Sequence, residues 1–125
     1  MDLQRVRREV TNAQTTFPNV ECHPTSNGGL FVLAALQPRT QIYTLRILFP
    51  DTYPNVMPSV YVSKPAIKTT APHRYKDGNL CYLHPRMWNP GLHSLTFVIG
   101  RTAKWLAKYE VWQSTGSWPG AELPH

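Results

Sequence analysis

The sequence predicts an α+β domain in which an N-terminal helix, a four-stranded antiparallel meander, a long loop and one covering helix follow one another. Three observations predict this class: a helical apolar pattern begins the chain, extended segments with short turns follow it, and a second helical pattern lies near the end. The 125 residues, 42% of them hydrophobic, are enough for one core. We therefore expect a single domain over residues 1–125.

The first helix is predicted to begin after Asp2, whose carboxylate can cap it, and to run to about Gln14. Leu3, Val6 and Val10 recur at helical spacing, whereas the arginines of this segment fall on other faces. This is the pattern of an amphipathic helix that buries one face.

Four segments after this helix are predicted to be strands. They are residues 20–23, 29–36, 41–49 and 59–63. The turn sequences at 25–29 and 37–40 are short enough to form hairpins of an antiparallel meander. Apolar residues from Tyr43 onward alternate with Thr44 and Arg46, which is the period of a sheet with one buried face.

A second helix is predicted to cover that face, from a cap at Ser94 to about Trp112. Its apolar stripe consists of Leu95, Val98, Ile99, Thr102, Leu106 and Tyr109. Gly100 weakens the helix, and its missing side chain would permit close packing on the sheet. The connection before the helix, residues 64–93, is long and has little periodicity, as functional loops often do.

Charge and composition restrict the function classes. The formal net charge is +6, which favours an acidic partner surface. Nucleic-acid binding is not predicted, because no basic stripe interleaved with aromatic residues is present. No apolar run approaches the roughly 20 residues of a membrane span, and no secretory leader is apparent. With two cysteines, we expect a cytoplasmic protein with free thiols, of which Cys22 is structural.

Cys81 is the candidate nucleophile. It lies in a polar loop, residues 73–90, that also contains histidine, glycine, tryptophan and proline. A reactive thiolate needs donors or cations nearby and access for a substrate, and this loop suggests such a setting. The alternative is a loop thiol without a chemical role.

The segment Phe49-Pro-Asp-Thr-Tyr-Pro-Asn-Val-Met-Pro-Ser-Val60 resembles the strand and turn of ubiquitin-conjugating enzymes. Gly78 stands three residues before Cys81, as a glycine does before the active-site cysteine of that family, and Trp88-Asn-Pro resembles its Trp-Ser-Pro element. The resemblance implies a UBC-like fold, truncated after the covering helix. It also implies that Cys81 accepts an acyl group as a thioester and passes it to an amine.

The ending at residues 115–122 is similar to compact bacterial forms of this family from cyclic-oligonucleotide antiphage (CBASS) operons. This similarity implies a partner whose C-terminus is conjugated, either a CD-NTase-type nucleotidyltransferase or a ubiquitin-like modifier. No Gly-rich phosphate loop is present, so we expect no cofactor. The acyl group would then arrive already activated by a separate enzyme or domain.

One departure from the family affects the proposed chemistry. Ala71-Pro-His73 stands where the family has His-Pro-Asn, which makes His73 a candidate oxyanion stabiliser or base. His84, three residues after Cys81, is a second candidate, and Asn79 could orient the loop or donate to the thioester carbonyl. The alternatives are a solvated histidine at 73, a backbone-bonded histidine at 84 and simple turn chemistry at 79.

Arg5, Arg7 and Arg8 match the helix by which the family meets its activating enzyme, although a solvated charged face is the alternative. We expect Trp88 and Tyr75 to pack the loop rather than to contact the acyl group.

Two other functions compete with conjugation. One is a binding module of the same fold that has lost catalysis, although the inactive variants of the family lack the cysteine. The other is a zinc site, because Cys81 and His84 with His73 and His93 supply sulfur and nitrogen ligands. Their spacing is not typical of zinc sites, so we expect that no metal is bound.

Overall fold

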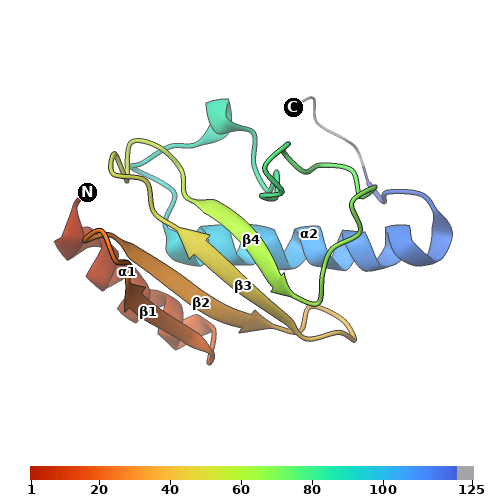
Figure 1. Cartoon of the computed structure of the whole chain (residues 1–125), viewed down its shortest axis with the longest axis horizontal. Coiled ribbons are helices and arrows are strands. Elements are labelled where there is room, and N and C mark those ends of the chain that lie inside the picture. The colour runs from red at the N-terminus through yellow and green to blue at the C-terminus, as the bar shows by residue number, and fades with distance from the viewer. Residues whose placement is uncertain (121–125) are drawn as a thin grey trace.

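The computed structural model describes residues 1–120 and confirms the predicted α+β class. The elements are α1 (Leu3–Thr16), β1 (Val20–Pro24), β2 (Leu30–Leu36), β3 (Tyr43–Leu48), β4 (Ser59–Lys64), the short 3-10 helix η1 (Pro85–Met87) and α2 (Leu95–Thr115) (Figure 1). The four strands form one antiparallel sheet in the order β1-β2-β3-β4. Of the residues 115–122 that carried the CBASS similarity, 121 and 122 lie outside the described residues. No helix within residues 1–120 is long and apolar enough to cross a membrane.

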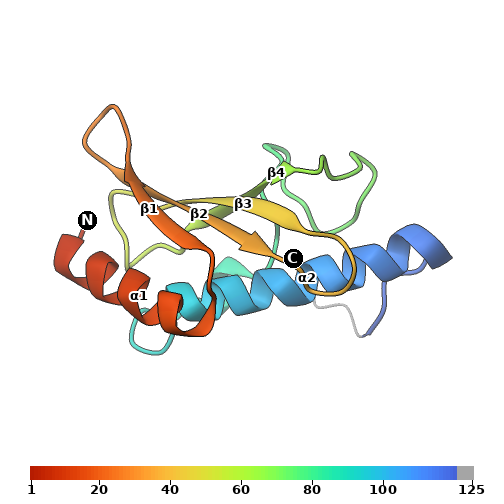
Figure 2. The same cartoon turned by 90° about the horizontal axis from the view of Figure 1, so that it is seen from below.

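Both long helices cover the same face of the sheet (Figure 2). The alternation along the strands sends one set of side chains to that face, where they meet the apolar stripes of the helices. The fully buried residues include Val6, Val32, Leu45, Ile47, Val60, Leu95, Val98, Ile99 and Leu106. The described residues therefore share one hydrophobic core.

The two predicted helix caps have different outcomes. Asp2 caps α1 as predicted, because its Oδ1 accepts a hydrogen bond from the Arg5 backbone N at 3.0 Å. Ser94 occupies the N-cap position of α2, but its side chain makes no capping hydrogen bond. The Glu9 carboxylate replaces it, since Oε1 accepts from the Leu95 N–H at 2.7 Å. The Ser94 prediction was correct in position and wrong in mechanism.

Glu9 is the centre of a buried polar network. The residue is 5% exposed, and its carboxylate also accepts from the Tyr53 hydroxyl and from Nε of Arg5. Arg5 in turn donates through Nη2 to the backbone oxygens of Pro90 and His93, at 2.6 and 2.9 Å. Burial, followed by the contact with Glu9, raises the pKa of Tyr53. The network joins α1, the β3–β4 turn and the segment before α2.

The expected role of Gly100 was wrong. This residue lies on the exposed side of α2, and a Cβ placed on it would meet nothing within 4 Å. Close packing on the sheet therefore does not require glycine at this position.

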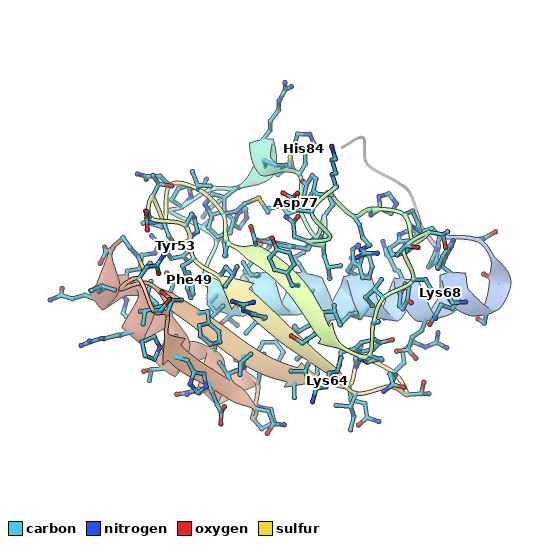
Figure 3. All side chains as sticks on the ribbon, in the orientation of Figure 1. Phe49, Tyr53, Lys64, Lys68, Asp77 and His84 are labelled. Carbon is cyan, nitrogen blue, oxygen red and sulfur yellow. The ribbon has the colours of Figure 1, made fainter. Side chains whose placement is uncertain are left out.

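The connection between β4 and α2 contains two short regular elements. Residues 73–81 form a small hairpin and η1 follows it, neither of which was predicted. Trp88 packs this segment as expected, because its Nε1 donates to the Pro54 backbone oxygen at 2.7 Å. Figure 3 shows Tyr53 at the end of the sheet next to α1, and Asp77 of the hairpin and His84 above β4.

We predict that Glu9→Ala lowers the free energy of unfolding by about 3–5 kcal/mol, because it leaves Arg5, the Tyr53 hydroxyl and the Leu95 N–H without their shared acceptor. Urea unfolding followed by circular dichroism measures this. Arg8→Ala on the exposed side of α1 is the control and should change stability by about 0.5 kcal/mol or less. Equal effects of the two substitutions would contradict the role given to Glu9.

Candidate active site

The loop that carries Cys81 is a hairpin with its turn at Asp77 and Gly78. The Tyr75 N–H donates to the Asn79 oxygen at 2.9 Å, and the Cys81 N–H donates to the His73 oxygen at 2.8 Å. Gly78 has a φ of 91°, a left-handed conformation that glycine adopts without steric strain. The two arms are thus paired antiparallel through an isolated bridge between Arg74 and Leu80, with His73 opposite Cys81.

The hairpin is attached to the core on two sides. The Leu80 N–H donates to the Val60 oxygen of β4 at 2.9 Å, and Leu80 is 1% exposed. From the other side, Trp105 of α2 donates through Nε1 to the His73 oxygen at 3.1 Å. Residues on both arms are therefore held by the sheet and by the second helix, which fixes the position of Cys81.

Side-chain alternation along the hairpin brings Tyr75 next to Cys81. Because Leu80 points into the core, its neighbour Cys81 points to the opposite face, and Tyr75 on the other arm is a diagonal neighbour on that face. The Cys81 Sγ donates a hydrogen bond to the Tyr75 hydroxyl at 3.3 Å. Tyr75 thus contacts the Cys81 thiol within the loop, and the expectation that it does not contact the acyl group stays a prediction.

Cys81 is buried, with 5% of its surface exposed. Burial raises the pKa of the Cys81 thiol, and the hydrogen bond with Tyr75 acts in the opposite direction without cancelling it. The expectation of an open loop thiol was wrong, because its neighbours Leu80 and Tyr82 are themselves anchored in the core. The Tyr82 hydroxyl, for example, donates to the Pro58 oxygen at 2.6 Å.

His73 has an unusual backbone conformation. Its φ is 59°, in the left-handed region that non-glycine residues seldom occupy, so strand alternation does not set the direction of its side chain. The ring centroid lies 5.0 Å from that of Trp118 in a tilted arrangement. Strain of this kind often occurs at functional sites. The role of His73 in catalysis stays a prediction.

The other two predicted polar residues have backbone contacts. The His84 Nδ1 accepts from the Arg86 N–H at 3.1 Å and caps η1, a contact that fits the backbone-bonded alternative. Asn79 supplies the oxygen that pairs with Tyr75 in the hairpin, as turn chemistry would require. Catalytic roles for both residues remain predictions.

The three arginines proposed for partner binding differ in their surroundings. Arg5 is half-buried and engaged with Glu9 and two backbone oxygens, so its guanidinium has a structural role. Arg7 and Arg8 are exposed, and their role in partner binding stays a prediction. Cys22 is partly buried, and burial raises its pKa while Arg7 opposes the shift, in keeping with a structural thiol.

The zinc alternative has no ligand cluster to support it. Within residues 1–120, no group of three or more histidine, cysteine, aspartate or glutamate side chains is placed to hold a metal ion. His93 accepts a hydrogen bond from the Asn89 N–H at Nδ1 and stacks on Phe97 with ring centroids 4.0 Å apart. Its ring thus packs the loop before α2.

Comparison with known proteins gives the family. The family model described as "Type II CBASS E2 protein" matches residues 9–125. The chain belongs to the type II CBASS E2 protein family. An E2-like role in CBASS follows from this membership, whereas the details of the chemistry do not. A search of curated proteins found no match to this E2 protein.

Solved structures confirm the UBC fold. One neighbour is the human ubiquitin-conjugating enzyme E2 G1, with a TM-score of 0.57 and 20% identity over 82% of this chain and 91% of that one. Another is the Vps23 UEV in a complex with ubiquitin, with a TM-score of 0.61 and 14% identity over 83% of this chain and 81% of that one. At these identities the likeness establishes the fold of the CBASS E2 protein alone.

We predict that alkylation of Cys81 in a Cys22→Ser protein reaches its plateau at a higher pH than alkylation of the same chain unfolded in urea. The folded thiol has a raised pKa, so at any pH below the plateau a smaller fraction of it is thiolate than in the unfolded chain. Rates with iodoacetamide from about pH 6 to about pH 10 measure this. Because the midpoint is compared rather than the rate, restricted access does not affect the result. A midpoint equal to or below that of the unfolded chain would contradict it.

Proposed function

We propose that this CBASS E2 protein accepts an activated protein C-terminus on Cys81 as a thioester and passes it to an amine. The observation that carries the proposal is the position of Cys81 on a hairpin held by the β4 backbone and by Trp105 of α2. A carrier needs its sulfur at one defined place, because transfer depends on the alignment of the reacting atoms. Family membership supports the same role.

Charging requires the thiolate of Cys81. The thiol first releases its proton to water, and the sulfur then attacks the carbonyl carbon of the activated C-terminus. A C–S bond forms while the bond to the activating group breaks, and that group departs with the electron pair. The chain activates no carboxylate itself, so a separate activating enzyme or domain supplies the activated acyl group.

Transfer reverses the role of the sulfur. An amine nitrogen attacks the thioester carbon, a C–N bond forms, and sulfur leaves with the electron pair as thiolate, while the nitrogen loses a proton to solvent. The developing oxyanion needs a hydrogen-bond donor. We assign this role to His73, which lies opposite Cys81 in the hairpin, with Asn79 and His84 as further candidates.

Family membership supports a proposal for the acyl donor and the other partners. In this proposal the donor is the C-terminus of a CD-NTase-type nucleotidyltransferase of the antiphage system, with a ubiquitin-like modifier as the alternative. Arg7 and Arg8 on the exposed side of α1 contribute to contact with the activating protein. Their charge favours an acidic surface on that partner.

A binding module without catalysis is the second candidate function. The burial and raised pKa of Cys81 favour it, since both oppose thiolate formation. A structural neighbour is a UEV in a complex with ubiquitin, which gives an example of a binding role on this fold. In this case partners would bind equally well when Cys81 is replaced.

We predict that Cys81→Ser folds normally and forms no reductant-sensitive adduct with its activated partner. Serine has nearly the shape of cysteine, but its oxygen is a weaker nucleophile, so the product would be a stable oxyester or nothing. Non-reducing gels after incubation with the activating system measure this.

Cys22→Ser is the matched control and should charge like the wild type. Reductant-sensitive adducts that persist in Cys81→Ser and disappear in Cys22→Ser would mean that Cys22, and not Cys81, is the nucleophile. Unchanged partner binding without any adduct in the wild type would favour the binding module.

We predict that His73→Ala slows discharge of a preformed thioester by roughly 10²–10³-fold, the range for loss of one oxyanion donor. Thioester formation should be less affected. Single-turnover discharge to an amine measures this, and thermal unfolding monitors the fold, because His73 also contacts Trp118.

His73→Asn restores the residue that the family has at this place. Near-normal transfer by this variant would mean that hydrogen-bond donation suffices, whereas a slow but folded variant would indicate proton transfer or special geometry. If the His73→Ala thioester discharges at the wild-type rate, His73 is not the oxyanion donor, and His84 or Asn79 becomes the candidate.

A further inference from the structure

We infer that Tyr75 is the hydrogen-bond donor that stabilises the reacting sulfur of Cys81 whenever that sulfur carries negative charge. The inference deepens the proposed function and rests on it for its catalytic meaning. It concerns a residue that we expected to pack the loop rather than to contact the acyl group.

The geometry of the hairpin supports a direct contact. The Tyr75 oxygen and the Cys81 Sγ are 3.3 Å apart, and their backbones are tied together by the pairing of Tyr75 with Asn79 and of Cys81 with His73. Each arm is anchored separately, Leu80 to β4 and His73 to α2. The contact therefore does not depend on a mobile side chain reaching across solvent.

The direction of this hydrogen bond depends on the charge of the sulfur. The neutral thiol donates its S–H to the Tyr75 oxygen. The thiolate has no proton to donate, so the tyrosine O–H must turn and donate to sulfur. Burial and the contact with Cys81 raise the pKa of Tyr75 to about 12, so the phenol keeps its proton at neutral pH and can donate it. The Tyr75 oxygen and the Cys81 Sγ can therefore form a hydrogen bond both when the sulfur is a thiol and when it is a thiolate.

A donor at this place matters most because the sulfur is buried. In water the thiolate would be solvated, but Cys81 as a residue is only 5% exposed, so burial reduces that solvation. A hydrogen bond to a charged acceptor is roughly twice as strong as a neutral one. Tyr75 would therefore assist the two moments at which charge is on the sulfur, namely attack during charging and departure during transfer.

The test is the pH dependence of Cys81 alkylation in Tyr75→Phe, with Cys22→Ser in every protein so that one thiol reacts. Phenylalanine keeps the ring and removes only the hydroxyl. At pH 7 we expect alkylation roughly three- to tenfold slower than in the parent, because the loss of thiolate is partly offset by the higher intrinsic nucleophilicity of a thiol with a higher pKa. The plateau at high pH should move upward.

Tyr61→Phe on β4 is the matched control, since Tyr61 is also a partly buried tyrosine but lies outside the hairpin. It should leave the profile unchanged. A Tyr75→Phe profile that superimposes on the parent would overturn the inference. Faster alkylation at pH 7 would overturn it as well, because Tyr75 would then act as a cover that restricts access to the thiol.

The charging assay separates this inference from the proposed function. Alkylation needs no acyl partner, so a shifted Tyr75→Phe profile supports the contact with the thiolate even if the wild-type protein never forms a thioester. A thioester that forms in the wild type, together with an unchanged Tyr75→Phe profile, supports the proposed function and overturns the role of Tyr75. Slower discharge of Tyr75→Phe thioester, with a normal profile for Tyr61→Phe, supports both.

Discussion

The buried carboxylate of Glu9 connects the parts of this fold that hydrophobic packing alone would leave loosely oriented. It receives hydrogen bonds from α1, from Tyr53 in the β3–β4 turn and from the first N–H of α2. A negative charge at a helix N-terminus is favourable, and Arg5 compensates the charge while holding the backbone that enters α2. Because α2 also anchors the hairpin that carries Cys81 through Trp105, the network indirectly supports the position of Cys81.

Much of the fold follows from periodicity, whereas the links between elements do not. The helix and strand patterns predicted all six long elements, because each needs only a local sequence with one apolar face. The cap of α2 could not be predicted in this way, since its acceptor Glu9 lies 86 residues away in the chain. A cap supplied by tertiary structure has no local sequence signal.

The candidate site was also predicted only in part from the sequence. Motif resemblance singled out Cys81 as the candidate nucleophile, a role that stays a prediction, and the family model shows that the chain is an E2 protein of the CBASS family. The contact with Tyr75 was missed because the loop was treated as irregular, although Asp77-Gly78 is a common hairpin turn. Pairing around that turn would have placed Tyr75 and Cys81 on one face. The burial of the thiol was also missed, because it depends on Leu80 and Tyr82 reaching the core.

A buried sulfur suits a carrier better than it suits a simple nucleophile. Removal from water disfavours the thiolate, but the thiol and the thioester are both neutral, so burial does not disfavour the loaded state in the same way. Burial can also exclude the water that would hydrolyse the thioester. The difficulty is confined to the steps in which sulfur is charged, and a local donor such as Tyr75 is most effective there. Under the proposed function, the same environment would protect the acyl group and make its release depend on specific contacts.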